Sequence, residues 1–98
     1  MARLIWSPRS RENLRAIRRY IGSSSRLRAT LFVQRLIAGA ELLTLFPYAG
    51  RIVPEDERGE LREVFVRGYR IVYHVNGDNV EINQVVHGAQ QLTELPEL

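Results

Sequence analysis

The chain has 98 residues, of which 45% are hydrophobic and 26% are charged, and it contains no cysteine. This composition predicts one globular domain over residues 1–98 and excludes disulfides, thiolate metal sites and a thiol nucleophile. All 14 basic residues are arginine, which excludes a Schiff-base lysine and a phosphate-loop lysine. The most apolar stretch, Leu36 to Phe46, contains Glu41 and is too short to span a bilayer. No signal-peptide pattern is present either, so no membrane partner is expected, and the lack of cysteine is compatible with the cytoplasm.

Charge is divided unevenly along the chain. Residues 1–51 hold ten arginines against two glutamates, whereas residues 52–98 hold four arginines against nine acidic residues. An asymmetry of this size predicts a basic face that meets an acidic partner. The alternative is that the two halves neutralise one another within the fold through exposed ion pairs.

The first predicted elements are a short strand over residues 3–7 and a helix that begins directly after it. Ser7 and Pro8 favour a helix start, because serine can cap free backbone N–H groups and proline is tolerated in the first turn. At about 100° per residue, one arc of this helix is predicted to face the core: Leu14, Ile17, Tyr20 and Ile21. An adjacent arc is basic and consists of Arg11, Arg15, Arg18 and Arg19.

A second helix is predicted after the segment Gly22 to Ser25, with Ser25 as its cap. Apolar residues recur along this helix at spacings of three and four: Ala29, Phe32, Leu36, Gly39, Leu43 and Phe46. Two amphipathic helices joined by so short a connection predict an antiparallel helical hairpin.

Beyond the helices the apolar period changes from 3.6 to 2. Residues 55–60 are acidic and predict a solvated loop. Three strands are predicted over residues 61–66, 69–75 and 80–86, and Asn76-Gly77-Asp78 is a strong hairpin signal. The expected fold is therefore α+β, with the helical hairpin packed on a three- to four-stranded antiparallel sheet to which the N-terminal strand adds an edge. Its shared core is predicted to contain Phe32, Leu36, Leu43, Ile71 and Tyr73.

Few residues offer catalytic chemistry. His74 and His87 lie on separate predicted strands without paired spacing, so no metal site is predicted, and no cofactor motif is present. RNA cleavage could use His87 as acid or base, with Arg62 and Arg70 on neighbouring strands as phosphate clamps. The alternative for His87 is a local hydrogen bond at the end of a strand. For the two arginines the alternative is pairing with a glutamate across the sheet: Glu60, Glu63 or Glu81.

Five segments form a recurring pattern. In chain order they are Ser7-Pro8 before a basic helix, Phe46-Pro47-Tyr48-Ala49-Gly50-Arg51, Leu61-Arg62-Glu63-Val64, Gly68-Tyr69-Arg70-Ile71-Val72-Tyr73 and Val85-Val86-His87. Over residues 3 to about 92 this pattern resembles the RelE/ParE superfamily of bacterial toxins. The resemblance implies a small cytoplasmic toxin of a type II toxin–antitoxin pair, with a ParD-like antitoxin whose C-terminal segment wraps around it. On the basic helix, the residues expected to bind this antitoxin are Arg11, Arg15, Arg18 and Arg19.

The superfamily has two activities. Its RelE-like members are ribosome-dependent mRNA endonucleases, which use basic residues on the central strands and a basic cluster with an aromatic residue after the last strand. Arg62 and Arg70 match the strand positions, but the segment after the last strand is Gly88-Ala89-Gln90-Gln91-Leu92, without arginine, lysine or tyrosine through Leu98. The chain therefore looks like the ParE branch, whose members poison DNA gyrase, trap it on cleaved DNA and block replication.

The ParE resemblance implies a chain with no catalytic residue of its own and no cofactor. Gln90, Gln91 and Leu92 are then the expected target contacts, and nucleic acid is expected to bind only through the toxin–target complex. Two alternatives come from other classes. One is the mRNA endonuclease, with Arg62, Arg70 and His87 as catalytic residues; the other is a basic nucleic-acid-binding module, which rests only on the arginine face.

Overall fold

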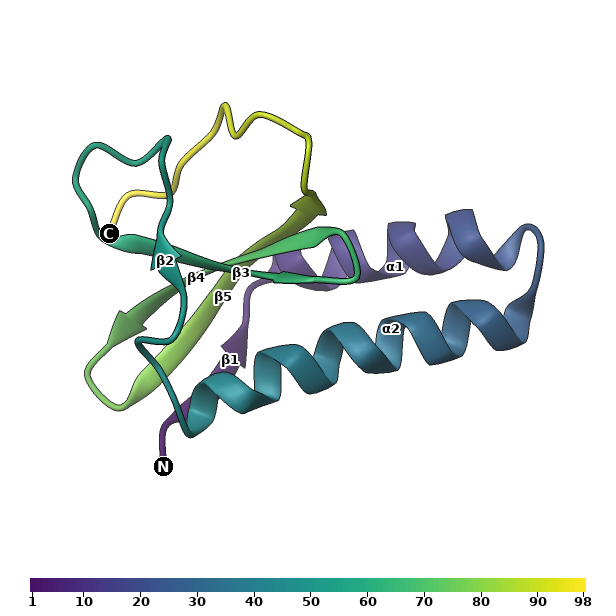
Figure 1. Cartoon of the computed structure of the whole chain (residues 1–98), viewed down its shortest axis with the longest axis horizontal. Helices are drawn as coiled ribbons and strands as arrows, with labels where there is room; N and C mark the ends of the chain where they lie inside the picture. The colour runs from purple at the N-terminus through teal and green to yellow at the C-terminus, as the bar shows by residue number, and fades with distance from the viewer.

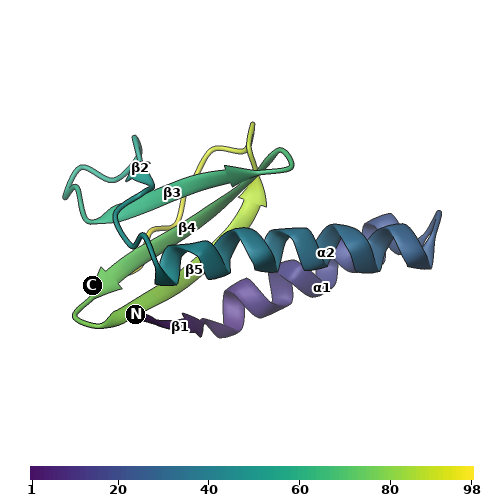
Figure 2. The same ribbon diagram turned by 60° about the horizontal axis from the view of Figure 1, so that its bottom comes forward.

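A computed structural model describes residues 1–98, and in it two helices cover one face of a five-stranded sheet (Figures 1 and 2). The strands lie in the order β1-β5-β4-β3-β2. In chain order the elements are β1 (Arg3–Trp6), α1 (Pro8–Gly22), α2 (Arg26–Glu41), the 3-10 turn η1 (Leu42–Thr44), β2 (Arg51–Ile52), β3 (Leu61–Val66), β4 (Tyr69–Asn76) and β5 (Asn79–His87). Neither helix is both long enough and apolar enough to cross a membrane.

The α+β fold class and the antiparallel order of β3, β4 and β5 are confirmed. The sheet has one strand more than expected, because Arg51 and Ile52 pair with Glu63 and Arg62. The N-terminal strand does form an edge, but it runs parallel to β5 rather than antiparallel. Two-residue strands carry no period-two signal, and the direction of β1 depends on a partner far along the chain, so neither feature is encoded locally.

Both helices begin at the predicted serine caps. The Ser7 hydroxyl oxygen accepts the Ser10 N–H at 3.0 Å, and the Ser25 hydroxyl oxygen accepts the Arg28 N–H at 3.2 Å. Each bond satisfies one of the free N–H groups in a first helical turn. The two short polar segments therefore determine where the antiparallel hairpin starts and where it turns.

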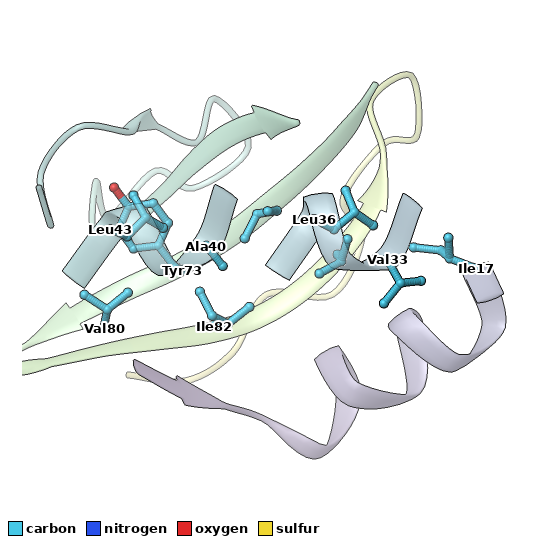
Figure 3. Close-up of a cluster of buried hydrophobic side chains, with 10 residues drawn as sticks. Ile17, Val33, Leu36, Ala40, Leu43, Tyr73, Val80 and Ile82 are labelled. Carbon is cyan, nitrogen blue, oxygen red and sulfur yellow. The ribbon is translucent and has the colours of Figure 1, made fainter. Parts of the chain in front are cut away.

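The main core lies between the helices and the sheet (Figure 3). Leu36 of α2 and Leu43 of η1 are buried against Ile71 and Tyr73 of β4, as predicted. The remaining core positions of α2 are Val33 and Ala40 rather than Phe32 and Gly39. Phe32 is half-buried and packs edge-on against the Tyr69 ring, with 5.7 Å between ring centroids.

Two aromatic residues predicted for the core are exposed. Phe46 is 63% exposed because α2 ends at Glu41 and the turn η1 changes the phase of the helical pattern before Phe46 is reached. Tyr20 is 78% exposed because the outer ends of α1 and α2 extend past the sheet (Figures 1 and 2). The helical hairpin therefore forms an arm whose far end packs only on itself.

A second, smaller core lies on the opposite face of the sheet. It contains Val53, Leu61, Val72, Val86 and Leu92. The segment after β2 and the C-terminal tail cover this face, on the side away from the helices (Figure 1). The tail is thus part of the folded structure, with Leu92 as its buried anchor.

Candidate functional site

Arg70 lies at the centre of a buried ion network on the tail-covered face of the sheet. Its guanidinium donates two hydrogen bonds to the Glu55 carboxylate, at 2.8 and 2.9 Å, and one to Glu63 Oε1 at 2.7 Å. Glu63 is fully buried and also accepts from Arg51 Nε at 2.6 Å. The predicted alternative of a glutamate partner is therefore confirmed for Arg70 with Glu63, a diagonal neighbour on β3.

The same network holds the C-terminal tail. Arg70 donates to the Gln90 carbonyl oxygen at 3.2 Å, and Glu55 Oε2 accepts the Leu92 N–H at 3.0 Å. Hydrogen bonds from Arg70, together with the Leu92 N–H, lower the pKa of Glu55 from 4.5 to about 2 despite its burial. Glu55 is therefore charged at neutral pH and joins the β2–β3 loop, β4 and the tail.

The acidic loop is not simply solvated, contrary to prediction. Burial of Asp56 raises its pKa, but this effect is outweighed by hydrogen bonds from the Arg58 side chain and from the N–H groups of Leu61, Glu60 and Arg58. The pKa of Asp56 is consequently lowered from 3.8 to about 2. Glu55 and Asp56 thus organise the loop through their hydrogen bonds.

Arg62 and His87 lie on the other face of the sheet, toward the helices. Arg62 donates to the Gly50 carbonyl oxygen at 2.7 Å, and its guanidinium stacks over the Tyr48 ring at 5.0 Å from the centroid. No carboxylate pairs with it. His87 is exposed, packs edge-on against Tyr69 with 5.6 Å between centroids, and accepts the Ala89 N–H on Nδ1.

The three residues considered for RNA cleavage do not converge. Side chains alternate between the faces of a strand, so Arg70 points away from the helix-facing Arg62 and His87. Arg62 is opposite Tyr73 of β4, and His87 is opposite Tyr69 of the same strand. These two positions are four residues apart, which corresponds to roughly 13 Å along the strand. With Arg70 already neutralised by two carboxylates, this arrangement has no acid–base group beside a free cation.

The four arginines expected to bind an antitoxin are all exposed on α1. Arg15 and Arg19 both pair with Glu12, at 3.1 and 3.0 Å, and these contacts lower the pKa of Glu12. Arg18 donates to the Thr30 hydroxyl of α2 at 3.0 Å, whereas the Arg11 side chain has no ion-pair or hydrogen-bond partner. The face therefore keeps a positive charge that Glu12 only partly offsets.

An apolar groove that the sequence did not reveal lies between the end of α2 and the edge of the sheet. Its volume is about 270 Å³, and the residues lining this apolar groove are Gly39, Leu42, Leu43, Phe46, Ala49, Val64, Phe65 and Val66. Because β2 pairs only with Arg62 and Glu63, the edge of β3 from Val64 to Val66 has no neighbouring strand. Arg51 lies over the exposed Phe65 ring at 5.4 Å, which puts a cation at the rim.

The tail residues expected to contact the target differ in exposure. Gln90 and Gln91 are exposed, and Gln91 lines a depression of about 370 Å³ together with Arg51, Phe65 and Gly88. Leu92 is buried in the smaller core. Its side chain therefore anchors the tail, and only the two glutamines present side chains at the surface.

Comparison with known proteins identifies relatives of this chain. Residues 4–92 match the family model described as the ParE toxin of type II toxin–antitoxin system, parDE. A protein named Toxin RelE2, from Caulobacter vibrioides, is 37% identical over 91 residues, which cover 92% of this chain and 99% of the relative. A solved structure of the chromosomal ParDE toxin–antitoxin system from P. aeruginosa contains a chain of the same fold. That match has a TM-score of 0.76 at 21% identity and covers 89% of this chain and 96% of the other.

Proposed function

The chain belongs to the ParE toxin family of type II toxin–antitoxin systems, and we propose that it acts by binding DNA gyrase and trapping it on cleaved DNA. A ParD-like antitoxin holds it inactive in the cytoplasm until that antitoxin is lost. A protein with this role needs a surface that recognises one conformation of gyrase, but it needs no proton transfer of its own. The observation that carries the proposal is that Arg62, Arg70 and His87 do not converge, since Arg70 is paired with Glu55 and Glu63 on the opposite face of the sheet.

The alternative activity is ribosome-dependent mRNA cleavage, to which the name of the Caulobacter relative points. Cleavage would need Arg62, Arg70 and His87 to act on one phosphodiester. Arg70 instead makes ion pairs with Glu55 and Glu63, and it faces away from the other two residues. Loss of one transition-state donor typically costs about 2.7–4 kcal/mol of activation free energy, so a site without Arg70 would already cleave RNA far more slowly. We therefore favour gyrase as the target.

We place the gyrase contact at the start of the C-terminal tail. Gln90 and Gln91 are exposed there, and the ion network of Arg70 and Glu55 holds the backbone on both sides of Gln91. Leu92 serves as the anchor that positions the two glutamines, rather than as a contact. A rigid backbone beneath exposed side chains lowers the entropy lost on binding.

The antitoxin uses two kinds of surface in this proposal. Arg11, Arg15, Arg18 and Arg19 attract its acidic residues, and the apolar groove takes its apolar anchors. Arg51 lies at the rim of the groove and favours an acidic amphipathic segment over a neutral one. Charged contacts at the edge of an interface mainly accelerate association, whereas buried apolar contacts mainly slow dissociation.

These two contributions can be separated by binding kinetics with the cognate antitoxin. Arg15→Glu with Arg18→Glu is expected to lower the association rate at low salt and to change the dissociation rate little. Phe46→Ser is expected to raise the dissociation rate and to leave association nearly unchanged, because Phe46 is exposed and uncharged. Unchanged association by the charge-reversed protein would show that α1 is not the antitoxin face.

Toxicity in cells tests the choice of target. His87→Ala is expected to remain fully toxic, whereas Gln90→Ala with Gln91→Ala is expected to lose toxicity while the protein still folds and binds antitoxin. Deletion of the tail after Gly88 is a less specific test, because it removes the buried Leu92 and unpairs Glu55. Loss of toxicity in His87→Ala, with retention in the double glutamine variant, would favour the endonuclease.

A further inference from the structure

The far end of the helical hairpin holds a basic pocket that only partly overlaps the face assigned to the antitoxin. It has a volume of about 550 Å³, and the residues lining this tip pocket are Arg18, Arg19, Gly22, Ser23, Arg26, Ala29 and Thr30. The pocket lies where α1 ends and α2 begins, on the arm that extends past the sheet (Figures 1 and 2). Three arginines that are distant from the body of the protein are thus brought together by one turn.

The charge of the tip pocket is largely uncompensated. No acidic residue lines it, and Arg26 takes part in no ion pair. The single nearby acid, Glu12, is shared between Arg15 and Arg19. The negative end of the α1 dipole and the positive end of the α2 dipole meet at this turn and largely cancel, so the arginine side chains supply the charge of the pocket.

The arginines of the tip pocket are also partly pre-organised. Arg18 donates to the Thr30 hydroxyl at 3.0 Å, which ties its guanidinium to the neighbouring helix and leaves its remaining N–H donors free. Planar guanidinium donors match the oxygens of a phosphate group better than an ammonium does. A pocket with these properties favours phosphate over a neutral ligand.

We propose that the tip pocket binds the phosphate backbone of double-stranded DNA. This inference rests on the proposed function to the extent that a gyrase complex brings DNA close to the toxin. The alternative ligand is an acidic protein segment, which normally also needs apolar anchors in the interface. The tip pocket offers only Ala29 for that purpose, whereas binding to a DNA backbone needs none.

Contact through three arginines gives weak, sequence-independent binding that depends strongly on salt. Gyrase must therefore concentrate the DNA near the toxin, and the arm adds affinity and orientation to a complex that gyrase already holds. Arg18 and Arg19 also belong to the face assigned to the antitoxin. An antitoxin seated on α1 therefore covers the tip pocket and competes with DNA.

The test measures the fluorescence anisotropy of a labelled DNA duplex of about 20 base pairs, titrated with the full chain between about 50 and 200 mM salt. The test variant is Arg18→Gln, Arg19→Gln and Arg26→Gln. Its matched control removes the same charge from three exposed arginines that have no ion pair: Arg3→Gln, Arg35→Gln and Arg67→Gln. Circular dichroism melts verify that both variants fold, since all six side chains are exposed.

The parent chain is expected to bind DNA with a steep salt dependence. A plot of log K against log salt has a negative slope, whose magnitude is about 0.9 for each phosphate contact. In the test variant, which loses three contacts, the magnitude of this slope should be smaller by about 2.7. Its affinity at the lowest salt should fall at least about tenfold, while the control keeps the slope of the parent. Antitoxin added beforehand should abolish binding of the parent.

Three results would overturn the proposal. The first is no salt-dependent binding by the folded parent, and the second is an equal loss of slope in the test and control variants. The third is that poly-glutamate displaces the labelled duplex as readily as unlabelled DNA does, when both competitors are added at the same concentration of negative charge. That result would assign the tip pocket to an acidic protein segment. Because gyrase is absent from this assay, a wrong choice of target would leave its outcome unchanged.

Discussion

Replacing Arg70 by methionine tests whether this residue is a structural ion-pair partner or a free cation. The substitution keeps most of the buried side-chain volume but removes the partner of Glu55 and one of the two partners of Glu63. Glu63 would then be fully buried with only the exposed Arg51 beside it. Gln90 and Leu92 would also lose the network that holds the tail.

The expected cost follows from the burial of the network. Removing one partner of a buried ion pair leaves an uncompensated charge and typically destabilises a protein by about 3–5 kcal/mol. The total free energy of unfolding of a chain of this length is about 5–15 kcal/mol, so this loss is a large fraction of its stability. At about 4–8 °C for each kcal/mol, the melting temperature should fall by at least about 12 °C.

The pH dependence separates this cause from simple loss of packing. In the parent, the pKa of Glu55 is about 2, so the carboxylate stays charged and paired at pH 4. Without Arg70 the two glutamates take up protons more readily, and protonation removes the buried charge. The difference in unfolding free energy between parent and variant should therefore shrink from pH 7 to pH 4.

Urea denaturation at both pH values measures these differences. Arg62→Met is the matched control, because Arg62 contacts backbone carbonyl oxygens and an aromatic ring but no carboxylate, and it should cost no more than about 1.5 kcal/mol. Adding Glu55→Gln and Glu63→Gln to Arg70→Met should restore part of the lost stability. An Arg70→Met protein within about 0.5 kcal/mol of the parent would refute the account of the network.

Three further predictions concern the core, the acidic loop and the Tyr73 hydroxyl. Leu36→Ala should cost about 2–5 kcal/mol in thermal melts, because Leu36 is fully buried, whereas the exposed Leu31→Ala should cost less than about 1 kcal/mol. Glu55 and Asp56 have lowered pKa values in the fold, so their contribution is complete above about pH 5 and is lost as the pH falls toward 2. For Glu55 alone, the loss of unfolding free energy is about 3 kcal/mol. Glu55→Gln should therefore reduce the fall in unfolding free energy below pH 5, and an unchanged fall would contradict the pairing of Glu55 with Arg70. Tyr73→Phe should cost about 1–3 kcal/mol in urea titrations, since it leaves the Gly50 N–H and the Pro47 carbonyl oxygen unpaired; a neutral result would show that other groups replace the Tyr73 hydroxyl.

The helices and the central strands could be predicted from the sequence because their signals are local. Ser7 and Ser25 cap helices from adjacent positions, and Asn76-Gly77-Asp78 connects β4 to β5 as the turn signal requires. The fine orientation of α2 could not be predicted, since it depends on how close the helix approaches β3. A Cβ atom at Gly39 would lie 2.6 Å from Val66, so this position meets the edge of the sheet instead of the core.

The candidate site was predictable only in part, for a related reason. The pairing of Arg70 with Glu63 follows from the antiparallel register of β3 and β4, and it was among the expected alternatives. Glu55 could not be identified as the second partner, because it comes from a loop whose path depends on Asp56 and on the tail. The apolar groove and the exposure of Phe46 could not be predicted, because both depend on where α2 ends.

The central claim is that this toxin acts on gyrase rather than on mRNA. The most direct measurement incubates the purified chain with gyrase, supercoiled plasmid and ATP, and in parallel with ribosomes translating a defined mRNA. We expect cleaved plasmid that depends on gyrase, is suppressed by the cognate antitoxin and persists in His87→Ala, with no cleavage of the mRNA. Cleavage of the mRNA at codon positions, abolished by His87→Ala, together with unaffected gyrase, would contradict this claim.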